Sequence, residues 1–397
     1  MKILHVLYQA LPNSAGSSTR SHSLIKSQRN IGISAEAISS PIQCSSNSLS
    51  RCKSDIIDDV EYHRSYLFSG LAVGTGGLLN QLLKLIAWPF FLCRLIIVCI
   101  KNKPNILHAH SMYYCCFAAI VAGFLFRIPV VYEIRSRWEL NPQANASKIK
   151  KTLAGLLEKI SCALVKKIVV ISSGLASYVE KINNEKPVII RNAILMNKIC
   201  DENKIINKFS DPQRKLKYGY VGSVINLEGI DLVLQSLIHL KAANKIFSFT
   251  IYGDGSALPE LKRIAQNNDL NVIFKGRIPY EKISEAYNDL DVVINFRRDL
   301  EISHTVTPLK PLEAMASGCF MICSDVLGML EITGGDSNVC VVKAEDTQAL
   351  ADCMKNFEHV KDLEVSKLIN SLSYLRNERT WEANALIYQR LYQNITR

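Results

Sequence analysis

The stretch VVINF at residues 292–296, followed by VTPLKPLEAMASG at residues 306–318, has the pattern of a buried strand, a loop and a helix. The expected helix, Leu309–Ser317, holds Pro311 and Glu313 in its early turns. Free backbone N–H groups and the helix dipole make such a helix start a binding point for anions. In open α/β sheets, ligands bind outside the carboxyl ends of the strands. The stretch therefore predicts an α/β fold with an anion site at this junction.

Three cations lie near this junction in the sequence. Lys310 falls in the first turn of the expected helix, and Arg297 and Arg298 follow the strand. Together with the helix start they would suit a diphosphate, and Glu313 would accept hydrogen bonds from ribose hydroxyls. The alternative is a solvated rim of arginines beside a carboxylate that stabilises the helix dipole.

Strand-like apolar runs alternate with helical segments along the chain, which predicts parallel sheets covered by helices. The expected strands are Ile3–Tyr8, Ala35–Ser39, Ile106–His108, Val130–Glu133, Ile168–Ile171, Val188–Ile190, Lys217–Val221, Phe247–Tyr252, Val272–Lys275, Val292–Phe296, Phe320–Cys323 and Val339–Val342. The expected helices include Arg20–Ile31, Lys148–Val165, Gly229–Ala242, Ser256–Asn268, Tyr280–Leu290 and Leu309–Ser317.

The length and composition favour two globular domains. The chain has 397 residues, of which 48% are hydrophobic and 21% charged, and one core rarely serves so long a chain. The polar stretch Asn197–Gln213 reads as the interdomain link.

The positive charge is concentrated in the first half. Of the net charge of +11, residues 1–197 carry +13 and residues 198–397 carry −2. A basic half favours an anionic partner such as a membrane surface or a lipid phosphate, and the alternative is a solvated basic surface with no partner. No motif of a nucleic-acid-binding protein is present. The apolar stretch 78–100 contains Lys84, Pro89 and Arg94. It reads either as a helix lying on a membrane interface or as an ordinary buried helix, rather than as a membrane span.

The cysteines and the N-terminus predict a cytoplasmic location. None of the 12 cysteines forms a C-x-x-C pair, so they read as free thiols in a reducing compartment rather than as metal ligands. The apolar run Met1–Tyr8 is too short for a signal peptide and reads as a first strand.

A set of short motifs resembles the family-4 retaining glycosyltransferases, in the order and spacing of that family. The motifs are Asn13–Arg20, His108–Ser111, Ile128–Arg135, Val170–Ser172, Ile190–Ala193, Gly219–Ser223, Tyr252–Gly255, Phe274–Arg277 and Glu313–Gly318. The motifs around Glu133 and Lys310 are similar to a bacterial branch that assembles surface polysaccharides.

The resemblance implies the GT-B fold, with two Rossmann-like domains, a cleft between them and a C-terminal helix that crosses back. Residues 1–197, with 377–397 packed on them, would form the acceptor-side domain, and residues 198–376 the domain that binds the nucleotide-sugar. The implied reaction moves a hexosyl or N-acetylhexosaminyl group, with retention, to a glycan or a polyisoprenyl-diphosphate-linked acceptor of O-antigen or capsule type. The enzyme would work in the cytoplasm, peripherally at the inner face of the cell membrane.

The resemblance also implies site residues. His110, Arg135 and Lys310 would be catalytic, and Glu133 would lie on the acceptor side. The donor would contact Gly16, Gly222, Ser223, Gly253, Gly276, Arg277, Arg297, Thr307, Pro308, Leu309 and Glu313. From the residues alone, His110 could instead be an ordinary loop histidine, and Glu133 and Arg135 a surface ion pair; His108 reads as a packing residue.

The sequence departs from the family pattern at three positions. Ser223 and Glu228 stand near the places of two phosphate-binding cations, and Thr305 replaces the first of two carboxylates. We expect Lys310, with Arg297 or Arg298, to replace the missing cations.

Two other functions stay open. One is a GT-B-fold sugar-nucleotide epimerase, which Thr305 disfavours, and the other is a non-catalytic subunit of a transferase complex. No G-x-G-x-x-G follows the first strand, so we expect no dinucleotide cofactor. We also expect no metal, because cations and a helix start can stabilise a leaving diphosphate without one.

Overall fold

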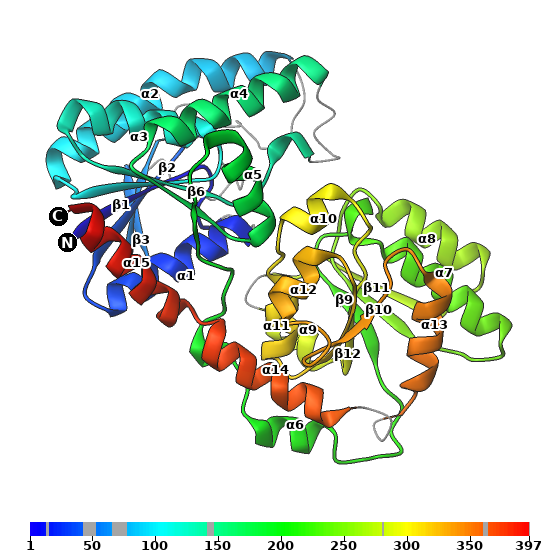
Figure 1. Ribbon diagram of the computed structural model, residues 1–397. Coiled ribbons are helices and arrows are strands. Elements are labelled where there is room, and N and C mark those ends of the chain that lie inside the picture. Colours follow the sequence, from blue (N-terminus) through cyan, green and yellow to red (C-terminus); the bar gives the residue numbers. More distant parts are fainter. Residues whose placement is uncertain are drawn as a thin grey trace. The chain divides into compact units, whose positions relative to one another are not determined.

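The computed structural model describes residues 1–12, 16–42, 53–65, 78–140, 147–279, 282–359 and 364–396, with the backbone alone at 78–81 and 138. The chain divides into two compact units (Figure 1). Unit 1 comprises Met1–Arg191 and Trp381–Arg397, and unit 2 comprises Asn192–Thr380. Each unit contains one sheet, and the α/β fold with two Rossmann-like domains expected from the sequence is confirmed.

Unit 1 is built on an eight-stranded sheet in the order β3-β4-β2-β1-β5-β6-β7-β8, parallel except for the β3–β4 hairpin. Helices α2, α3 and α4 lie over one face, and α1 and α15 lie over the other (Figure 1). Its elements are β1 Lys2–Leu7, α1 Gly16–Asn30, β2 Ser34–Ser39, β3 Ser54–Ile57, β4 Val60–Arg64, α2 Leu78–Asn102, β5 Ile106–His110, α3 Tyr113–Phe126, β6 Val130–Ile134, η1 Trp138–Leu140, α4 Lys148–Leu164, β7 Lys167–Val170, α5 Ser173–Asn183, β8 Val188–Ile189 and α15 Trp381–Thr396.

Unit 2 is built on a six-stranded parallel sheet in the order β11-β10-β9-β12-β13-β14. Its elements are η3 Met196–Lys198, α6 Glu202–Lys208, β9 Tyr218–Val221, η4 Asn226–Glu228, α7 Ile230–Ala242, β10 Phe249–Tyr252, α8 Leu258–Asn267, β11 Val272–Gly276, α9 Ile283–Asn288, β12 Val292–Asn295, α10 Glu301–Thr305, α11 Lys310–Ala316, β13 Phe320–Ser324, α12 Leu327–Thr333, β14 Cys340–Val342, α13 Thr347–Asn356 and α14 Val365–Glu378.

Burial explains why the strands formed where the apolar runs predict them. Every residue of β5, β6, β9, β12 and β13 is buried, as is usual for parallel strands that have helices on both faces. Because such strands need apolar side chains on both sides, their sequences read as continuous apolar runs.

Three local features differ from the expectation. The β3–β4 hairpin was missed, because β3 alternates between exposed and half-buried residues and has no apolar run. Helix α10 interrupts the segment between β12 and α11 that was expected to be a loop, and it ends at Thr305. The stretch Asn197–Gln213 is not a link, since it contains α6 and most of η3 and belongs to unit 2. The chain passes between the units after Arg191 and after Thr380.

Helix α15 belongs to unit 1 although it is the last element of the chain. It lies beside α1 (Figure 1), and the guanidinium of Arg20 on α1 sits 4.8 Å from the ring centre of Trp381. Ala385, Tyr388 and Tyr392 of α15 are fully buried. Unit 1 is thus assembled from both ends of the sequence.

Helix α2 runs unbroken through Pro89 and has one packed face. Ala87, Phe91, Leu95, Val98 and Cys99, at helical spacing, are at most 3% exposed. The region Leu82–Asn102 is long and apolar enough to span a membrane, with a mean hydropathy of 2.2, and 28% of that stretch is buried.

Candidate functional site

Two glycines in unit 2 bring the carboxyl ends of β9 and β10 together. Gly222 follows β9 with φ 147°, and Gly253 follows β10 with φ 154°. A Cβ at Gly253 would lie 1.8 Å from the carbonyl oxygen of Gly222, and a Cβ at Gly222 would lie 2.4 Å from Cε of Lys310. Only glycine fits either position. The Lys310 side chain therefore runs across the end of β9.

A buried ionic cluster lies at this end of the sheet. Nζ of Lys310 is 2.8 Å from Oε1 of Glu228 and donates to the hydroxyl of Tyr220 at 2.6 Å. Arg297, which follows β12, donates to the same Glu228 oxygen at 2.9 Å. Arg297 and Glu228 are 8% and 4% exposed. The two expected cations, Lys310 and Arg297, thus come together around the carboxylate of Glu228. From the sequence, Glu228 was expected only to stand near the place of a phosphate-binding cation.

The electrostatics of this cluster favour a net positive charge. Burial opposes ionisation of Glu228, but Arg297 and Lys310 outweigh it and lower the pKa of this carboxyl to about 2. Burial lowers the pKa of Lys310, and Glu228 partly compensates. One carboxylate balances only one of the two cations, so the ion cluster of Glu228, Arg297 and Lys310 attracts anions.

Glu313 and Thr307 have partners within unit 2. The hydroxyl of Tyr287 donates to Oε2 of Glu313 at 3.3 Å, and burial raises the pKa of Glu313. Thr307 is 3% exposed, and its carbonyl oxygen accepts from the amide of Asn192 at 2.8 Å. Pro308 and Leu309 are half-buried. This segment is therefore held from within the unit.

Some expected donor residues lie outside the buried cluster. Ser223 and Arg277 are exposed, and Gly276 has φ 72° with no atom within 4 Å of an added Cβ. Arg298 pairs with Asp231 and with Glu345. Arg298 is therefore committed to surface carboxylates, and Arg297 is the arginine that joins Lys310.

Thr305 and Gly16 lie elsewhere. Thr305 ends α10, where its hydroxyl donates to the carbonyl oxygen of Glu301 at 3.0 Å. Gly16 is the exposed first residue of α1 in unit 1. The rest of its expected loop, residues 13–15, lies outside the described residues.

In unit 1, the carboxyl ends of β5 and β6 carry a buried charged network. Oε1 of Glu133 accepts from Arg20 Nη2 at 2.8 Å and from Arg135 Nε at 2.7 Å. Oε2 of Glu133 accepts from the hydroxyl of Tyr388. Arg135 also donates to Nδ1 of His110. Exposure is 0% for Glu133, 2% for His110 and 7% for Arg135, so the alternative of a surface ion pair is wrong.

The hydrogen bonds define the tautomer of each histidine in this network. Because a guanidinium can only donate, Nδ1 of His110 must accept, and its Nε2–H donates to Nδ1 of His5 at 2.7 Å. Nε2–H of His5 then donates to Oε1 of Gln28 at 2.8 Å. The amide of Gln28 donates to the hydroxyl of Tyr392 at 3.2 Å.

The hydrogen bonds continue in the same direction to the carboxylate of Glu133. The hydroxyl of Tyr392 donates to Nδ1 of His108 at 2.7 Å. The remaining nitrogen of His108, Nε2, lies 3.4 Å from Oε2 of Glu133, a long contact for a hydrogen bond. The donors thus run in one direction from Arg135 through the three histidines to Glu133. Because Arg135 also donates directly to Glu133, these residues form a nearly closed ring, which we call the histidine ring network.

The protonation states agree with this arrangement. Burial lowers the pKa of His5, His108 and His110, so these imidazoles are neutral near pH 7. Burial opposes the ionisation of Glu133, but Arg135 and Arg20 hold the pKa of its carboxyl well below its usual range. The expected acceptor-side Glu133 has no exposed surface. Both of its oxygens are engaged by Arg20, Arg135 and Tyr388, so in this structure Glu133 orders these side chains.

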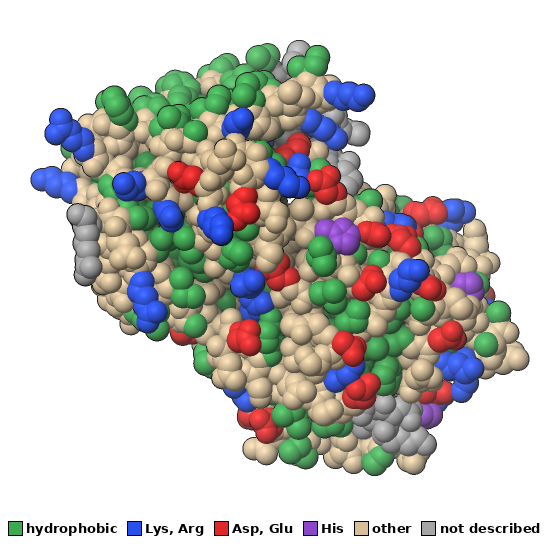
Figure 2. Space-filling view, viewed as in Figure 1, with side chains coloured by type: hydrophobic (Ala, Val, Ile, Leu, Met, Phe, Trp, Pro, Cys, Tyr) green, Lys and Arg blue, Asp and Glu red, His purple; other side chains and the backbone are tan. Residues whose placement is uncertain are grey.

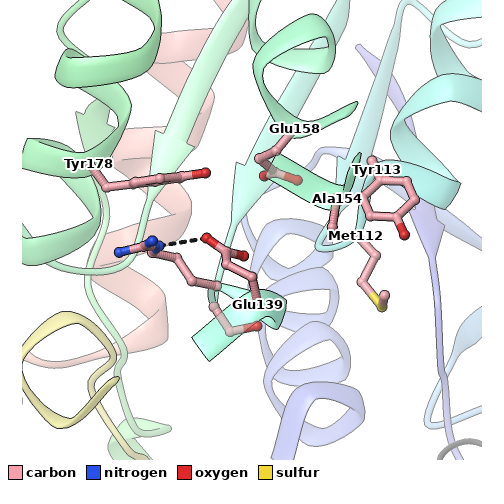
Figure 3. A pocket seen from close by; sticks show the side chains of 8 residues that line it. Met112, Tyr113, Glu139, Ala154, Glu158 and Tyr178 are labelled. Carbon is pink, nitrogen blue, oxygen red and sulfur yellow. Dashed lines mark hydrogen bonds and ion pairs between the residues drawn. The ribbon is translucent and has the colours of Figure 1, made fainter. Parts of the chain in front are cut away.

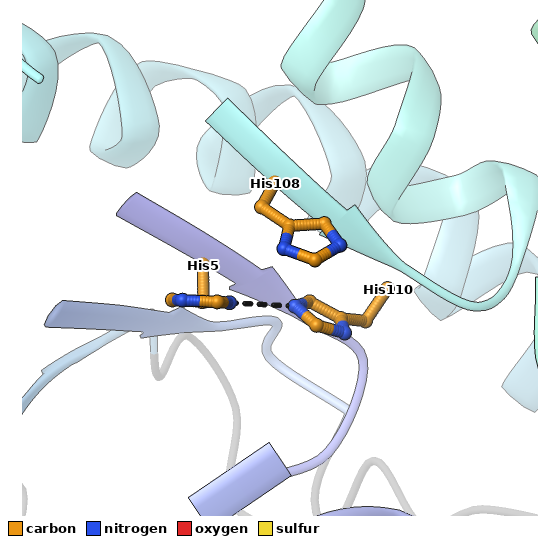
Figure 4. Close-up of side chains that lie close together, drawn as sticks. All are labelled: His5, His108 and His110. Carbon is orange, nitrogen blue, oxygen red and sulfur yellow. Dashed lines mark hydrogen bonds between the residues drawn. The ribbon is translucent and has the colours of Figure 1, made fainter. Parts of the chain in front are cut away.

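The three histidines are close enough to share a metal ion (Figure 4). One nitrogen of each lies within 4.8 Å of the others. The lone pair of His110 Nδ1, however, accepts from Arg135, and His5 bonds through both nitrogens. A divalent cation here would also face the buried charges of Arg20 and Arg135, which disfavours its binding.

Most residues of the histidine ring network were not predicted from the sequence. His5 escaped because it lies inside an apolar run, although it pairs in register with His108 on the neighbouring strand. That pairing of polar residues in two buried strands was the available signal. The contributions of Gln28, Tyr388 and Tyr392 come from helices α1 and α15, whose placement strand patterns do not reveal.

Family models match both halves of the chain. Residues 65–196 match the model described as glycosyltransferase family 4, and residues 215–358 match the model described as glycosyl transferases group 1. A comparison with curated proteins gives no match.

Solved structures with the same fold cover almost the whole chain at low identity. Sucrose-phosphate synthase from Thermosynechococcus elongatus has a TM-score of 0.74 at 14% identity, over 100% of this chain and 99% of that one. HepE of Anabaena in complex with UDP has a TM-score of 0.67 at 14% identity, over 99% and 100%. The catalytic domain of starch synthase IV from Arabidopsis thaliana, bound to ADP and acarbose, has a TM-score of 0.70 at 12% identity, over 100% and 99%.

We predict that Tyr392→Phe destabilises unit 1. The change removes the hydroxyl that links Gln28 to His108 and leaves their buried polar atoms unpaired, which costs about 1–3 kcal/mol. Thermal unfolding followed by circular dichroism should show a lower Tm. Leu386→Ala, at a position 46% exposed on the same helix, is the control and should change the Tm little. Equal Tm values for the two variants would contradict the network.

We predict that Glu228 stabilises the protein at neutral pH and that this stabilisation is lost in acid. Its pKa of about 2 lies below the usual 4.5, so the stabilisation is complete above about pH 4.5 and is lost as the pH falls towards 2. Glu228→Gln should cost about 3 kcal/mol at pH 7, because Arg297 and Lys310 lose their carboxylate. Urea unfolding at pH 7, 4.5 and 3.5 measures this difference in free energy. A difference that grows below pH 4.5 would rule out the assignment.

Proposed function

Since the chain is a glycosyltransferase of the family-4 type with the GT-B fold, we propose that it moves a sugar, with retention, from a nucleoside-diphosphate sugar to a glycan or lipid-linked acceptor. The transferred group is a hexosyl or N-acetylhexosaminyl group. The context we propose is the assembly of a bacterial surface polysaccharide of O-antigen or capsule type, on the resemblance of the motifs around Glu133 and Lys310.

The observation that carries this proposal is the ion cluster of unit 2. Lys310 and Arg297 share one carboxylate, that of Glu228, at the carboxyl end of β9 and β12. Ligands of parallel α/β sheets bind at this edge. Gly222 and Gly253 present backbone without side chains beside the cluster, so a diphosphate could approach closely. The solved structures of similar fold bound to UDP or ADP support a nucleotide ligand.

Lys310 is the group we propose to stabilise the leaving diphosphate. Two of its three ammonium protons are used by Tyr220 and Glu228, which leaves one for a phosphate oxygen. Its side chain is 19% exposed, so the charge is both accessible and poorly screened. Fixed cations that face the developing negative charge lower the barrier without reorganising solvent. Retention would then follow from attack on the same face as the leaving group, without a protein nucleophile.

The donor contacts we propose follow from the placement of the other residues. Glu313 and the segment Thr307–Leu309 would hold the nucleoside, with Ser223, Gly276 and Arg277 at the exposed margin. In unit 1, Gly16 at the start of α1 would approach the donor. His110 and Arg135 would order the ends of β5 and β6 beside the reacting groups, with Arg135 donating also to the carbonyl of Ser17 at 3.1 Å.

An apolar surface of unit 1 supports a membrane-bound acceptor. The outer face of α2 exposes Leu82, Leu85, Ile86, Phe90, Ile97 and Ile100, the end of α3 exposes Phe124, Leu125 and Phe126, and α4 exposes Ile149, Leu153, Leu156, Ile160 and Leu164. Figure 2 shows hydrophobic side chains gathered along the edge of unit 1 formed by α2 and α4.

Basic residues lie beside this apolar surface. Helix α4 carries Lys148, Lys150, Lys151 and Lys159. Apolar side chains flanked by lysines are typical of helices that lie on anionic bilayers. We therefore propose that the enzyme works at the cytoplasmic face of the membrane and takes a polyisoprenyl-diphosphate-linked acceptor from it.

We predict that Lys310→Ala weakens nucleoside-diphosphate binding. Loss of a charge-assisted hydrogen bond of about 1.5–3 kcal/mol corresponds to about a 10- to 150-fold higher Kd. Isothermal titration with UDP, GDP, ADP and dTDP measures the Kd, and Arg297→Ala is tested in parallel. Lys355→Ala, an exposed lysine of α13, is the matched control. Unchanged affinity in both Lys310→Ala and Arg297→Ala would show that the ion cluster does not bind the diphosphate of the donor.

An assay with the same purified protein distinguishes a transferase from a non-catalytic subunit. Incubation with nucleotide-sugars in the absence of acceptor should release sugar slowly if the chain is a transferase. A non-catalytic subunit is the alternative favoured by Glu228, because this carboxylate neutralises one cation of the ion cluster; such a subunit would release no sugar from any donor.

We predict that the triple variant Leu153→Ser, Leu156→Ser, Ile160→Ser releases the protein from vesicles. Each side chain is at least 38% exposed, and insertion of each would contribute about 1 kcal/mol or more, so binding should weaken by more than about tenfold. Sedimentation with vesicles of phosphatidylcholine and phosphatidylglycerol measures this. The control is Ile206→Ser, Ile246→Ser in unit 2, at positions 62% and 79% exposed. Equal binding by the two variants would exclude this surface as the membrane contact.

A further inference from the structure

A hollow opens at the carboxyl ends of β5 and β6, within unit 1 (Figure 3). The empty space within it and at its mouth, open solvent included, amounts to about 430 Å³. The lining residues come from the loops after β5 and β6 and from η1, α3, α4 and α5: Met112, Tyr113, Ser136, Arg137, Glu139, Ala154, Glu158 and Tyr178. Neither the ion cluster of unit 2 nor the histidine ring network contributes a residue to it.

One wall of the hollow is an ordered ion pair against an aromatic ring. Nε of Arg137 donates to Oε1 of Glu139 at 2.7 Å, and each side chain is 17% exposed. The guanidinium of Arg137 lies 4.3 Å from the ring centre of Tyr178, a cation–π arrangement. These contacts hold the carboxylate of Glu139 in place. Its second oxygen, Oε2, can accept from a ligand.

A second carboxyl group, Glu158 of α4, lies across the hollow (Figure 3). Both of its oxygens lie within reach of the Tyr132 hydroxyl, at 3.0 and 3.1 Å. Burial raises the pKa of Glu158 to about 7, so near neutral pH it exists in both forms and can either donate to a hydroxyl group or accept from one.

Backbone strain marks the rim of the hollow. Met112 precedes α3 with φ 84° and ψ 129°, a conformation that side chains rarely adopt. Such strain persists only where the surrounding structure enforces it, and it concentrates at binding sites. Met112, Tyr113 and Ala154 contribute the apolar part of the lining.

The charges of the lining indicate the class of ligand. Among the described lining residues the single cation, Arg137, is paired with Glu139, and Glu158 adds a negative charge whenever it ionises. A phosphate group would therefore be repelled. A sugar ring combines hydroxyl groups, which suit carboxylates, with an apolar face, which suits Met and Tyr side chains.

We propose that this hollow binds an uncharged sugar residue of the acceptor. The hydroxyl groups of the sugar would form hydrogen bonds with Glu139 and Glu158, and its apolar face would pack against Tyr113 and Met112. This inference rests on the proposed glycosyl transfer and names the chemistry of the acceptor. The carboxyl ends of β5 and β6 also carry His110 and Arg135, so the bound sugar lies at the sheet edge where we propose that the reaction occurs.

The test uses the full chain and four methyl glycosides, those of glucose, galactose, mannose and N-acetylglucosamine. Ligand-observed NMR titration measures their Kd, which for single sugars is on the order of 1 mM or weaker. We expect at least one to bind, and its Kd to rise about tenfold or more in Glu139→Gln and in Glu158→Gln. Glu180→Gln, at an exposed position of α5, is the matched control and should leave the Kd unchanged.

The outcomes separate this inference from the proposed function. If none of the glycosides binds up to the solubility limit, or if all variants bind alike, the hollow is not a sugar site. Displacement of a glycoside by inorganic pyrophosphate would also overturn it, since the lining should reject phosphate. Titrations of the same samples with UDP and GDP report on the donor site alone. If the unmodified protein binds a glycoside but neither nucleotide, the proposed transfer is overturned and the sugar site is not. Circular dichroism melting of each variant confirms that it is folded.

Discussion

Much of unit 1 depends on one buried carboxylate. Glu133 is held by Arg20 from α1, by Arg135, which follows its own strand, and by Tyr388 from α15. A carboxylate with no exposed surface is stable only when cations and hydrogen bonds replace its hydration. These partners are residues 20, 135 and 388. Their hydrogen bonds to Glu133 therefore hold segments from both ends of the sequence at the edge of one sheet. The histidine ring network extends that tie to β1 and β5.

Unit 2 solves a similar problem in a different way. Glu228 is also buried between two cations, Arg297 and Lys310, but all three residues come from segments beside β9 and β12. In unit 1 the cations are consumed in holding the structure, since Arg135 also donates to the carbonyl of Ser17 and to His110. In unit 2 Lys310 keeps part of its surface exposed. The same chemical arrangement therefore stabilises one unit and leaves the other with charge to offer a ligand.

The sequence was sufficient for the sheets and insufficient for the networks. Strands such as Phe320–Ser324 and Ile106–His110 are buried on both faces, so their apolar runs identify them directly. The ion pair of Lys310 with Glu228 could not be read from spacing, because it joins residues 82 positions apart through a loop conformation. Helix α10 was hidden for a different reason: five residues with polar side chains at both ends give no measurable periodicity. The hollow beside Tyr178 was missed because its lining comes from six separate segments, each unremarkable alone.

The place of α15 has a consequence for how the protein is made. The sheet of unit 1 is synthesised before unit 2, yet Trp381, Tyr388 and Tyr392, which complete its packing and its hydrogen bonds, leave the ribosome after unit 2. Unit 2, continuous from Asn192 to Thr380, emerges whole before them. Domains usually fold in order from the N-terminus during synthesis. Here the order of completion is reversed. Unit 2 can complete its fold while Glu133 of unit 1 still lacks one partner, Tyr388 of helix α15.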